Sequence, residues 1–123
     1  MHLQESGEMY LETIYVLSKK SNFVRSIDVC DYMGYSKPSV SRAVGILKKA
    51  GYVIMDKDGF LTLSDSGLEI AKKIYERHTV LTDFLIRLGV DKGIAMEDAC
   101  KMEHDISDVT FEALKRHAGK SRT

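Results

Sequence analysis

The feature that most constrains the fold of this 123-residue chain is a pair of amphipathic helical patterns separated by a tight turn. The first pattern begins at Ser26, a suitable N-cap, and directs four residues toward a core: Ile27, Val29, Cys30 and Met33. Gly34 follows at the point where the end of a helix requires a positive φ. Ser36 then caps the second pattern, whose first turn contains Pro38. The spacing predicts two short helices joined by a turn, the second ending near Gly51.

A hairpin pattern follows this pair of helices. Two β-prone runs flank the sequence DKDG at 56 to 59, whose glycine supplies the left-handed residue of a turn, and they predict a hairpin at 52 to 63. Apolar residues at helical spacing predict the remaining helices at about 6 to 19, 68 to 88, 94 to 106 and 108 to 118. Ser64 can cap the helix at 68 to 88, which is long; we expect it to bend or break and to end at Gly89.

The order helix, short helix, turn, helix and hairpin is that of a winged helix-turn-helix. We therefore expect a mainly α-helical chain with one small β-hairpin. A winged helix-turn-helix domain would occupy residues 1 to 66, and a helical region would occupy residues 67 to 123.

In such a domain the second helix of the pair enters the major groove of DNA. The predicted DNA-contacting residues are Ser36, Lys37, Pro38, Ser39 and Arg42. Arg42 can reach a guanine edge or a phosphate, and the hydroxyls and Lys37 can bind phosphate. Single winged-helix domains bind weakly, so we expect a homodimer that reads a two-fold operator. A solvated helix face without a partner is the alternative.

The net charge is zero, but charge is unevenly distributed along the chain. Residues 19 to 58 contain eight Lys or Arg against four Asp, whereas residues 91 to 112 contain seven acids against two Lys. The first segment suits a polyanion and the second suits cations, although ordinary surface variation gives similar patterns. The start of the sequence has no secretory pattern and no apolar run is long enough to span a membrane. We therefore expect a cytoplasmic protein with reduced cysteines.

A second feature is the sequence DACKMEHD at 98 to 105. On a helix, Cys100, Glu103 and His104 point to one side, and their sulfur, oxygen and nitrogen donors suit iron, cobalt, nickel or zinc. Met9 and Glu12 likewise share one face of the first predicted helix, and His78 lies within the long one. Three helices could bring these donors together. Each residue also has an ordinary explanation, since buried Cys and Met usually fill a core.

Several motifs together resemble one protein family. They are EMYLETIY at 8 to 15, SKPSVSRAV at 36 to 44, LTLSDSGLEIA at 61 to 71, RHTVLTDFL at 77 to 85 and DACKMEHDIS at 98 to 107. With these motifs, which span nearly the whole chain, the sequence resembles the iron- and manganese-dependent repressors related to the diphtheria toxin repressor and the manganese transport regulator. The resemblance implies a short form without the SH3-like domain of longer members.

The resemblance also implies that a divalent metal acts as corepressor and that residues 67 to 123 form a dimerisation and metal-binding region. The family's ligand positions correspond here to Met9, Glu12, His78, Cys100, Glu103 and His104. Met9 and Cys100 resemble the iron branch, whereas Glu12 with His78 resembles the manganese branch. Thr82 and Met96 stand where the iron branch has further ligands, which puts its ancillary site in doubt, although His78, Glu12 and Glu8 could still hold a second ion.

Thioether and thiolate donors disfavour Mn²⁺, so Fe²⁺ is the expected metal and Mn²⁺ the second choice. We expect the metal to tie the first helix to the later ones and so to fix the DNA-binding domain relative to the dimer. Metal and DNA would then strengthen each other's binding. The predicted apolar dimer interface consists of Ile106, Val109, Phe111 and Leu114.

Two other classes of protein remain open at this point. A metal-independent winged-helix regulator of the multiple-antibiotic-resistance type, which senses a small organic ligand, has a similar order of elements. A metalloenzyme would need an open coordination position and a nearby general base. No H-E-x-x-H pattern, Gly-rich phosphate loop or Ser/His/Asp set occurs, and we do not expect an enzyme.

Overall fold

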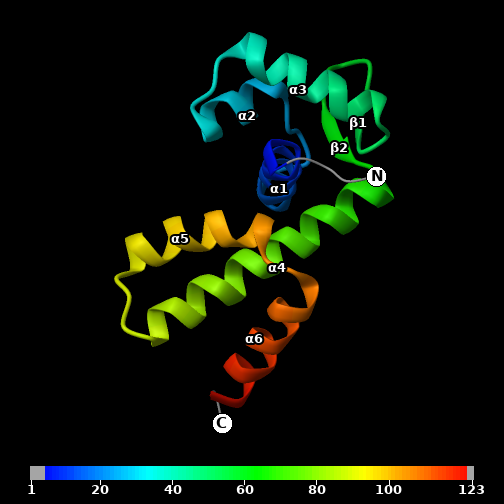
Figure 1. Ribbon diagram of the computed structural model, residues 1–123. Helices are drawn as coiled ribbons and strands as arrows, with labels where there is room; N and C mark the ends of the chain where they lie inside the picture. The colour runs from blue at the N-terminus through cyan, green and yellow to red at the C-terminus, as the bar shows by residue number, and fades with distance from the viewer. Residues whose placement is uncertain (1–4, 122–123) are drawn as a thin grey trace. The chain divides into compact units, whose positions relative to one another are not determined.

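The computed structural model describes residues 5–121, which form a mainly α-helical chain with one small β-hairpin, as expected (Figure 1). The elements in order are α1 (Glu5–Lys20), α2 (Ser26–Met33), α3 (Lys37–Lys49), β1 (Val53–Met55), β2 (Leu61–Leu63), α4 (Asp65–Arg87), α5 (Lys92–Asp105) and α6 (Asp108–Ser121). The chain divides into two compact units, the first ending at Lys72 and the second beginning at Lys73. No helix of the described residues is long and apolar enough to cross a membrane.

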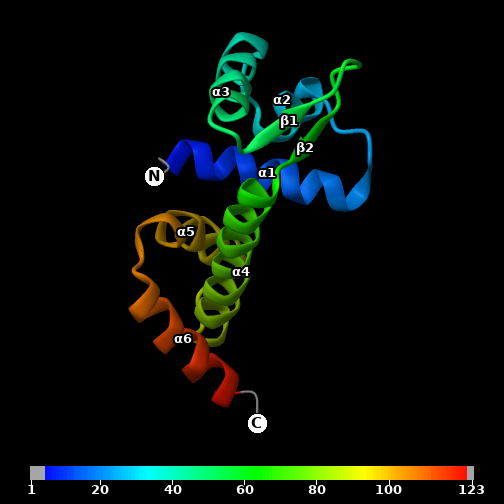
Figure 2. The same ribbon diagram turned by 90° about the vertical axis from the view of Figure 1, so that its right-hand side faces the viewer.

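The N-terminal unit is a winged helix-turn-helix. Helices α2 and α3 pack against each other and against α1 (Figure 2). The antiparallel hairpin pairs Val53 with Leu63. Its core consists of side chains from all of these elements, among them Leu11, Ile14, Val29, Val40, Val44, Leu47, Val53 and Leu61. The apolar periodicity of the sequence therefore predicted most of the buried positions of these helices correctly.

The turn between α2 and α3 has the predicted chemistry. Gly34 ends α2 with φ 74°, and its N–H donates to the carbonyl of Cys30 at 2.8 Å. Ser36 is the N-cap of α3, and its Oγ accepts from the N–H of Ser39 at 3.3 Å, with Pro38 in the first turn. These caps satisfy helix-end groups that would otherwise lack partners, and they fix the angle between the two helices.

The predicted start of α2 was wrong by one residue. The N-cap is Arg25 rather than Ser26, because the carboxylate of Asp28 accepts from the backbone N–H of Arg25 at 2.8 Å. This hydrogen bond between Asp28, the third residue of the helix, and the backbone of Arg25 thus determines where α2 begins. Ile27 was also expected to face the core but is 42% exposed, since Val29 and Cys30 already fill the buried side of this short helix.

Ser64 and Gly67 join the hairpin to α4. The Ser64 hydroxyl donates to the carbonyl of Gly51 at 2.6 Å and accepts from the N–H of Gly67 at 3.2 Å, which confirms its predicted role as a cap. A Cβ on Gly67 would lie 2.1 Å from the carbonyl oxygen of Tyr52. Only glycine permits the first turn of α4 to approach the backbone before β1 this closely.

Helix α4 is continuous over Asp65–Arg87, so the expected break does not occur. Its sequence contains no proline or internal glycine beyond Gly67, and these residues are the usual causes of a kink. The helix ends just before Gly89, which has φ 102°. Helix α5 begins earlier than predicted because Asp91 caps it, its carboxylate accepting from the N–H of Gly93 at 3.2 Å.

The C-terminal unit has its own small core. Leu81 of α4, Ala99 of α5 and Phe111 of α6 are buried together, with Ile106 and Leu114 packed beside them. Phe111 is 3% exposed within a single chain, so most of its side chain is used in this core, and its place in a dimer interface stays a prediction. Of the residues predicted for that interface, Val109 is the one that lies fully on the surface, 82% exposed.

Candidate metal centre and nucleic-acid interface

Three potential metal donors lie together on α5. Cys100, Glu103 and His104 occupy positions one turn apart, as the sequence predicted, and one donor atom from each lies within 4.8 Å of the others. Glu103 is fully buried and so is the His104 side chain, whereas Cys100 is of intermediate exposure. The helical spacing alone therefore creates a compact set of a sulfur, an oxygen and a nitrogen donor.

His78 on α4 adds a fourth potential donor. Its Nδ1 lies 3.0 Å from Oε2 of Glu103, and Nε2 of His104 lies 3.3 Å from Oε1 of the same carboxylate. Burial would raise the pKa of Glu103, but the neighbouring His104 and His78 together hold that pKa below its ordinary value. The carboxylate of Glu103 is therefore favoured in its ionised form between two imidazoles.

This arrangement fits a divalent transition metal. Both oxygens of Glu103 are buried, and neither accepts a well-directed hydrogen bond from the described residues despite the short contacts to the two rings. A buried carboxylate without such bonds is costly unless a cation or another donor satisfies it. Imidazole, carboxylate and thiolate are together the donor types that hold iron, cobalt, nickel or zinc.

Arg77 supports the centre from the neighbouring position on α4. Its buried guanidinium donates to the carbonyls of Glu103 at 3.0 Å and Ile106 at 2.7 Å, and it forms an ion pair with Asp108. Carbonyls in the last turn of a helix have no partner within that helix, so Arg77 fixes the end of α5 that carries the donors. Sequence reasoning missed this residue, although an arginine beside His78, one helical turn from the apolar Ile74 and Leu81, was a usable sign.

The two remaining predicted donors lie in the N-terminal unit. Met9 and Glu12 are both half-buried and stand three residues apart on α1, which places them on the same side of that helix. Their participation in a centre with the donors of α4 and α5 stays a prediction.

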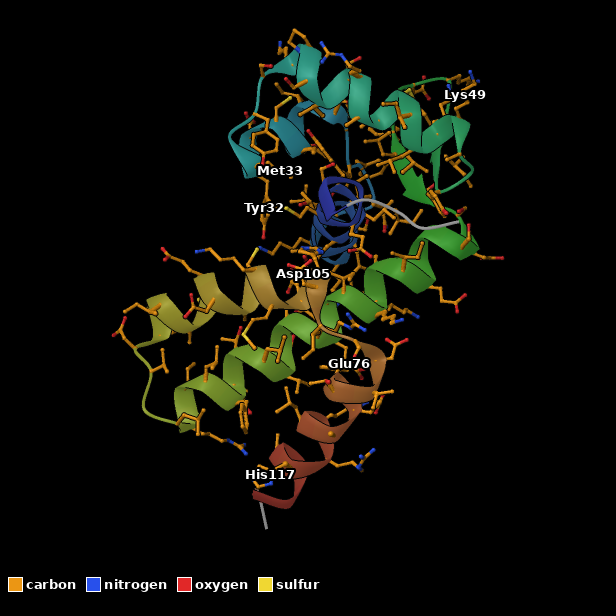
Figure 3. The ribbon with its side chains drawn as sticks, viewed as in Figure 1. Tyr32, Met33, Lys49, Glu76, Asp105 and His117 are labelled. Atoms are coloured by element: carbon orange, nitrogen blue, oxygen red, sulfur yellow. The ribbon has the colours of Figure 1, made fainter. Side chains whose placement is uncertain are left out.

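The predicted DNA-contacting residues lie at the start of α3. Lys37, Pro38, Ser39 and Arg42 are exposed, on the side opposite the buried residues Val40, Val44 and Leu47. The Ser36 hydroxyl is engaged in the cap, where it also donates to Oγ of Ser39 at 2.9 Å. Helix α3 carries four basic residues and no acid, and Lys49 lies at its C-terminal end (Figure 3). The outward side of α3 is thus a positively charged surface.

Two residues of this surface were missed by sequence reasoning. Ile46 is a large apolar residue that is 64% exposed, and Gly45 beside it is also exposed. Their positions three and four residues after Arg42 could have revealed them, because that spacing places side chains on one helix face.

Family models match both halves of the chain. Residues 2–61 match the model described as the N-terminal DNA binding domain of the iron dependent repressor. Residues 64–123 match the model described as the iron dependent repressor's metal binding and dimerisation domain. The resemblance predicted from the sequence motifs is therefore confirmed.

Individual relatives agree with the family models. An uncharacterized HTH-type transcriptional regulator of Methanocaldococcus jannaschii is 35% identical over 92% of this chain and 92% of its own length. The transcriptional regulator MntR of Escherichia coli is 32% identical over 93% of this chain and 74% of its own length. The solved structure of the manganese regulator SloR superposes with a TM-score of 0.82 and 29% identity, covering 97% of this chain. This chain spans 55% of that protein, about half its length.

Proposed function

The chain belongs to the iron-dependent repressor family, and on that premise we propose that it is a metal-dependent repressor that binds an operator on double-stranded DNA. The observation that carries this proposal is the buried Glu103 carboxylate between His78 and His104, next to Cys100. Arg77 fixes this part of the helix by binding the backbone carbonyl of Glu103. The buried carboxylate itself adds no apolar packing and is suited to binding a cation.

The proposed ligands of the metal are Met9, Glu12, His78, Cys100, Glu103 and His104. Bound there, a divalent ion supplies positive charge among acidic groups. Met9 and Glu12 on α1 would share that ion with the donors of α4 and α5, and so restrict the orientation of the winged unit. Metal and DNA would therefore strengthen each other's binding by the same factor.

We propose Fe²⁺ as the corepressor and Mn²⁺ as the second choice. The sulfur atoms of Cys100 and Met9 support Fe²⁺, because soft donors favour it over Mn²⁺. The likeness to SloR, a manganese regulator, supports Mn²⁺. The two ions can be separated by the free concentration at which each stimulates DNA binding.

We further propose that the protein acts as a homodimer on a two-fold operator. Support comes from the match of residues 64–123 to a dimerisation domain and from the basic outward side of α3. In a dimer, each α3 would meet a half-site about one helical turn of DNA, or a multiple of it, from the other.

The test is DNA binding with and without metal. A duplex is selected from a random pool with the metal-loaded protein, and its affinity is measured by fluorescence anisotropy under anaerobic conditions without metal and with Fe²⁺, Mn²⁺ or Zn²⁺. We expect stimulation of roughly 5- to 150-fold, the range of typical coupling energies. Equal binding by the metal-free and metal-loaded protein would show that the repressor is not metal-dependent.

Two variants sharpen this test. Glu103→Gln keeps the shape of the side chain, and we expect it to abolish the stimulation without lowering basal DNA binding. Cys100→Ser should reduce the advantage of Fe²⁺ over Mn²⁺. Stimulation of the wild-type protein by Mn²⁺ at a lower free concentration than Fe²⁺ would overturn the choice of metal and leave the repressor proposal standing.

A further inference from the structure

The outward side of α3 carries two residues that the fold of the N-terminal unit does not explain. Ile46 is 64% exposed and takes no part in the core of that unit. Gly45 lies in the helix interior, where a glycine costs about 1 kcal/mol relative to alanine. A Cβ on Gly45 would meet no atom of the described residues within 4 Å, so no close approach among residues 5–121 requires glycine there. The stability of the fold therefore explains neither an isoleucine at position 46 nor a glycine at position 45.

Both residues lie among the groups proposed to contact DNA. Ile46 follows Arg42 by four residues and precedes Lys49 by three, the spacing of neighbours on one helix face. With four basic residues and no acid on α3, this face is electrostatically suited to DNA. In the major groove, the one apolar group that marks a base is the 5-methyl group of thymine, and aliphatic side chains contact it.

We propose that Ile46 contacts the 5-methyl group of a thymine in the major groove of each half-site, and that Gly45 allows the DNA to approach α3 closely at that point. This inference rests on the proposed function and adds a base preference to it. Arg42, one turn earlier, lies where it can contact a guanine or a phosphate. Helix α3 then distinguishes bases by an apolar contact as well as by polar ones.

The experiment removes single methyl groups from the DNA. In the duplex selected by the wild-type protein, each thymine is replaced in turn by deoxyuridine, which lacks only the methyl group, and affinity is measured with saturating metal. We expect one position in each half-site to lose roughly fourfold in affinity, the value of one buried methyl-sized group. Replacement of the other thymines should change the affinity less.

Ile46→Ala identifies the side chain that makes this contact. The ratio of affinities for thymine and deoxyuridine at the sensitive position should fall to about one in this variant. Ile54→Ala is the matched control, because Ile54 is likewise an exposed isoleucine, 53% accessible, but lies on β1. This control should keep the wild-type ratio. A uniform loss of affinity in Ile46→Ala, with the ratio unchanged, would overturn the proposal, because it would place Ile46 against the DNA backbone.

Gly45→Ala provides a second, independent readout. Alanine has open space at this position and a higher helix propensity, so the variant should melt at a higher temperature than the wild type. It should nevertheless bind the selected duplex several-fold more weakly, because its methyl group would lie against the DNA. A stabilised variant that binds with wild-type affinity would remove Gly45 from the inference.

The failure of this inference and that of the proposed function give different results. A wild-type protein that selects no duplex, with or without metal, overturns both. A wild-type protein that binds its duplex in response to metal but is indifferent to every thymine methyl group overturns the inference alone.

Discussion

At position 103 the chain buries a carboxylate, and each of its oxygens lies near an imidazole nitrogen. The Arg77 guanidinium donates to the backbone carbonyls of Glu103 and Ile106. The buried Arg77 therefore positions the buried Glu103 by binding its backbone carbonyl. Single residues at this point therefore supply the donors and position the helix end that carries them.

Replacement of Arg77 tests this positioning role. Arg77→Met should lower the free energy of unfolding by about 1–3 kcal/mol, the cost of leaving buried polar groups without partners. Urea unfolding of the metal-free protein measures the loss. Arg116→Met, at an exposed position of α6, should change stability by no more than about 0.5 kcal/mol. Equal effects of the two substitutions would contradict the role assigned to Arg77.

Phe111 and Val109 allow a similar comparison on α6. Phe111→Ala should cost about 3–5 kcal/mol, because it removes a large side chain from the core of the C-terminal unit. Val109→Ala should leave the metal-free protein's stability within about 0.5 kcal/mol of wild type, because Val109 lies on the surface. Chemical denaturation distinguishes the two. A marked destabilisation by Val109→Ala that depends on protein concentration would place Val109 in a subunit interface.

At the scale of elements, the helix ends determine how the chain is organised. Gly34 and Ser36 set the turn between α2 and α3, and Ser64 links the hairpin to α4 through two hydrogen bonds. Helix α6 begins at Asp108, whose carboxylate is bound by Lys73 and Arg77 of α4. The ends of these elements are therefore tied to neighbouring elements by polar contacts, while their middles pack through apolar residues.

Gly67 tests the close contact between α4 and the backbone at Tyr52. Gly67→Ala should destabilise the protein by about 1–3 kcal/mol, because its Cβ would lie 2.1 Å from a backbone oxygen that cannot rotate away. The comparison is Gly45→Ala, also in a helix, which should stabilise the fold by about 0.5–1 kcal/mol. Thermal melting followed by circular dichroism should show shifts of opposite sign. Stabilisation by Gly67→Ala would mean that the chain relieves the contact easily.

The ion pairs at the start of α6 predict a pH dependence. The hydrogen bond and charge of Lys73, followed by those of Arg77, hold the pKa of Asp108 below its ordinary value. A carboxyl group whose pKa is depressed by folding adds stability above its unfolded pKa of about 3.9, and that stability disappears as the pH falls through the folded value. The difference in melting temperature between wild type and Asp108→Asn should therefore be constant near neutral pH and shrink below about pH 4.

Salt provides the control for this dependence. Asp108 is largely exposed, so added salt should screen its ion pairs and reduce the difference between the two proteins at every pH. A difference in melting temperature that is the same at pH 3 and pH 7 would show that the effect of the substitution is not electrostatic.

At the scale of the whole molecule, a DNA-binding unit and a metal-binding unit share one continuous helix, α4. His78 and Arg77 lie on the part of α4 that belongs to the second unit, whereas Gly67 lies on the part that belongs to the first. The proposed donors Met9 and Glu12 belong to the first unit, so the proposed corepressor would link the two units.

Metal binding by Glu12 variants tests this link. Saturating Mn²⁺ or anaerobic Fe²⁺ should raise the stability of the wild-type protein by about 2.7 kcal/mol at one hundred times the dissociation constant. Glu12→Gln should weaken the metal affinity, whereas Glu69→Gln, at an exposed position of α4, should not. Titration calorimetry and thermal melting measure the difference. Unchanged metal affinity in Glu12→Gln would confine the centre to the residues of the second unit.

The sequence by itself determined the order of the elements, most of their bounds and the donor set on α5. These features depend on local rules, namely apolar periodicity, capping residues and the one-turn spacing of Cys100, Glu103 and His104, all of which are encoded within a few residues. Predictions of where helices begin and of where they break were less accurate. The start of α2 depends on the bond from the Arg25 N–H to Asp28, and the continuity of α4 follows from the absence of proline and of further glycine in its interior.

Only the tertiary structure decided which of several similar residues is buried and which is exposed. Phe111 and Val109 are both apolar residues of one helix, and packing against Leu81 and Ala99 buries the first and leaves the second at the surface. The same applies to Arg77 and Gly67, whose roles depend on carbonyl groups distant in the sequence. Such contacts cannot be read from local patterns, because they arise from the approach of segments that the sequence does not bring together.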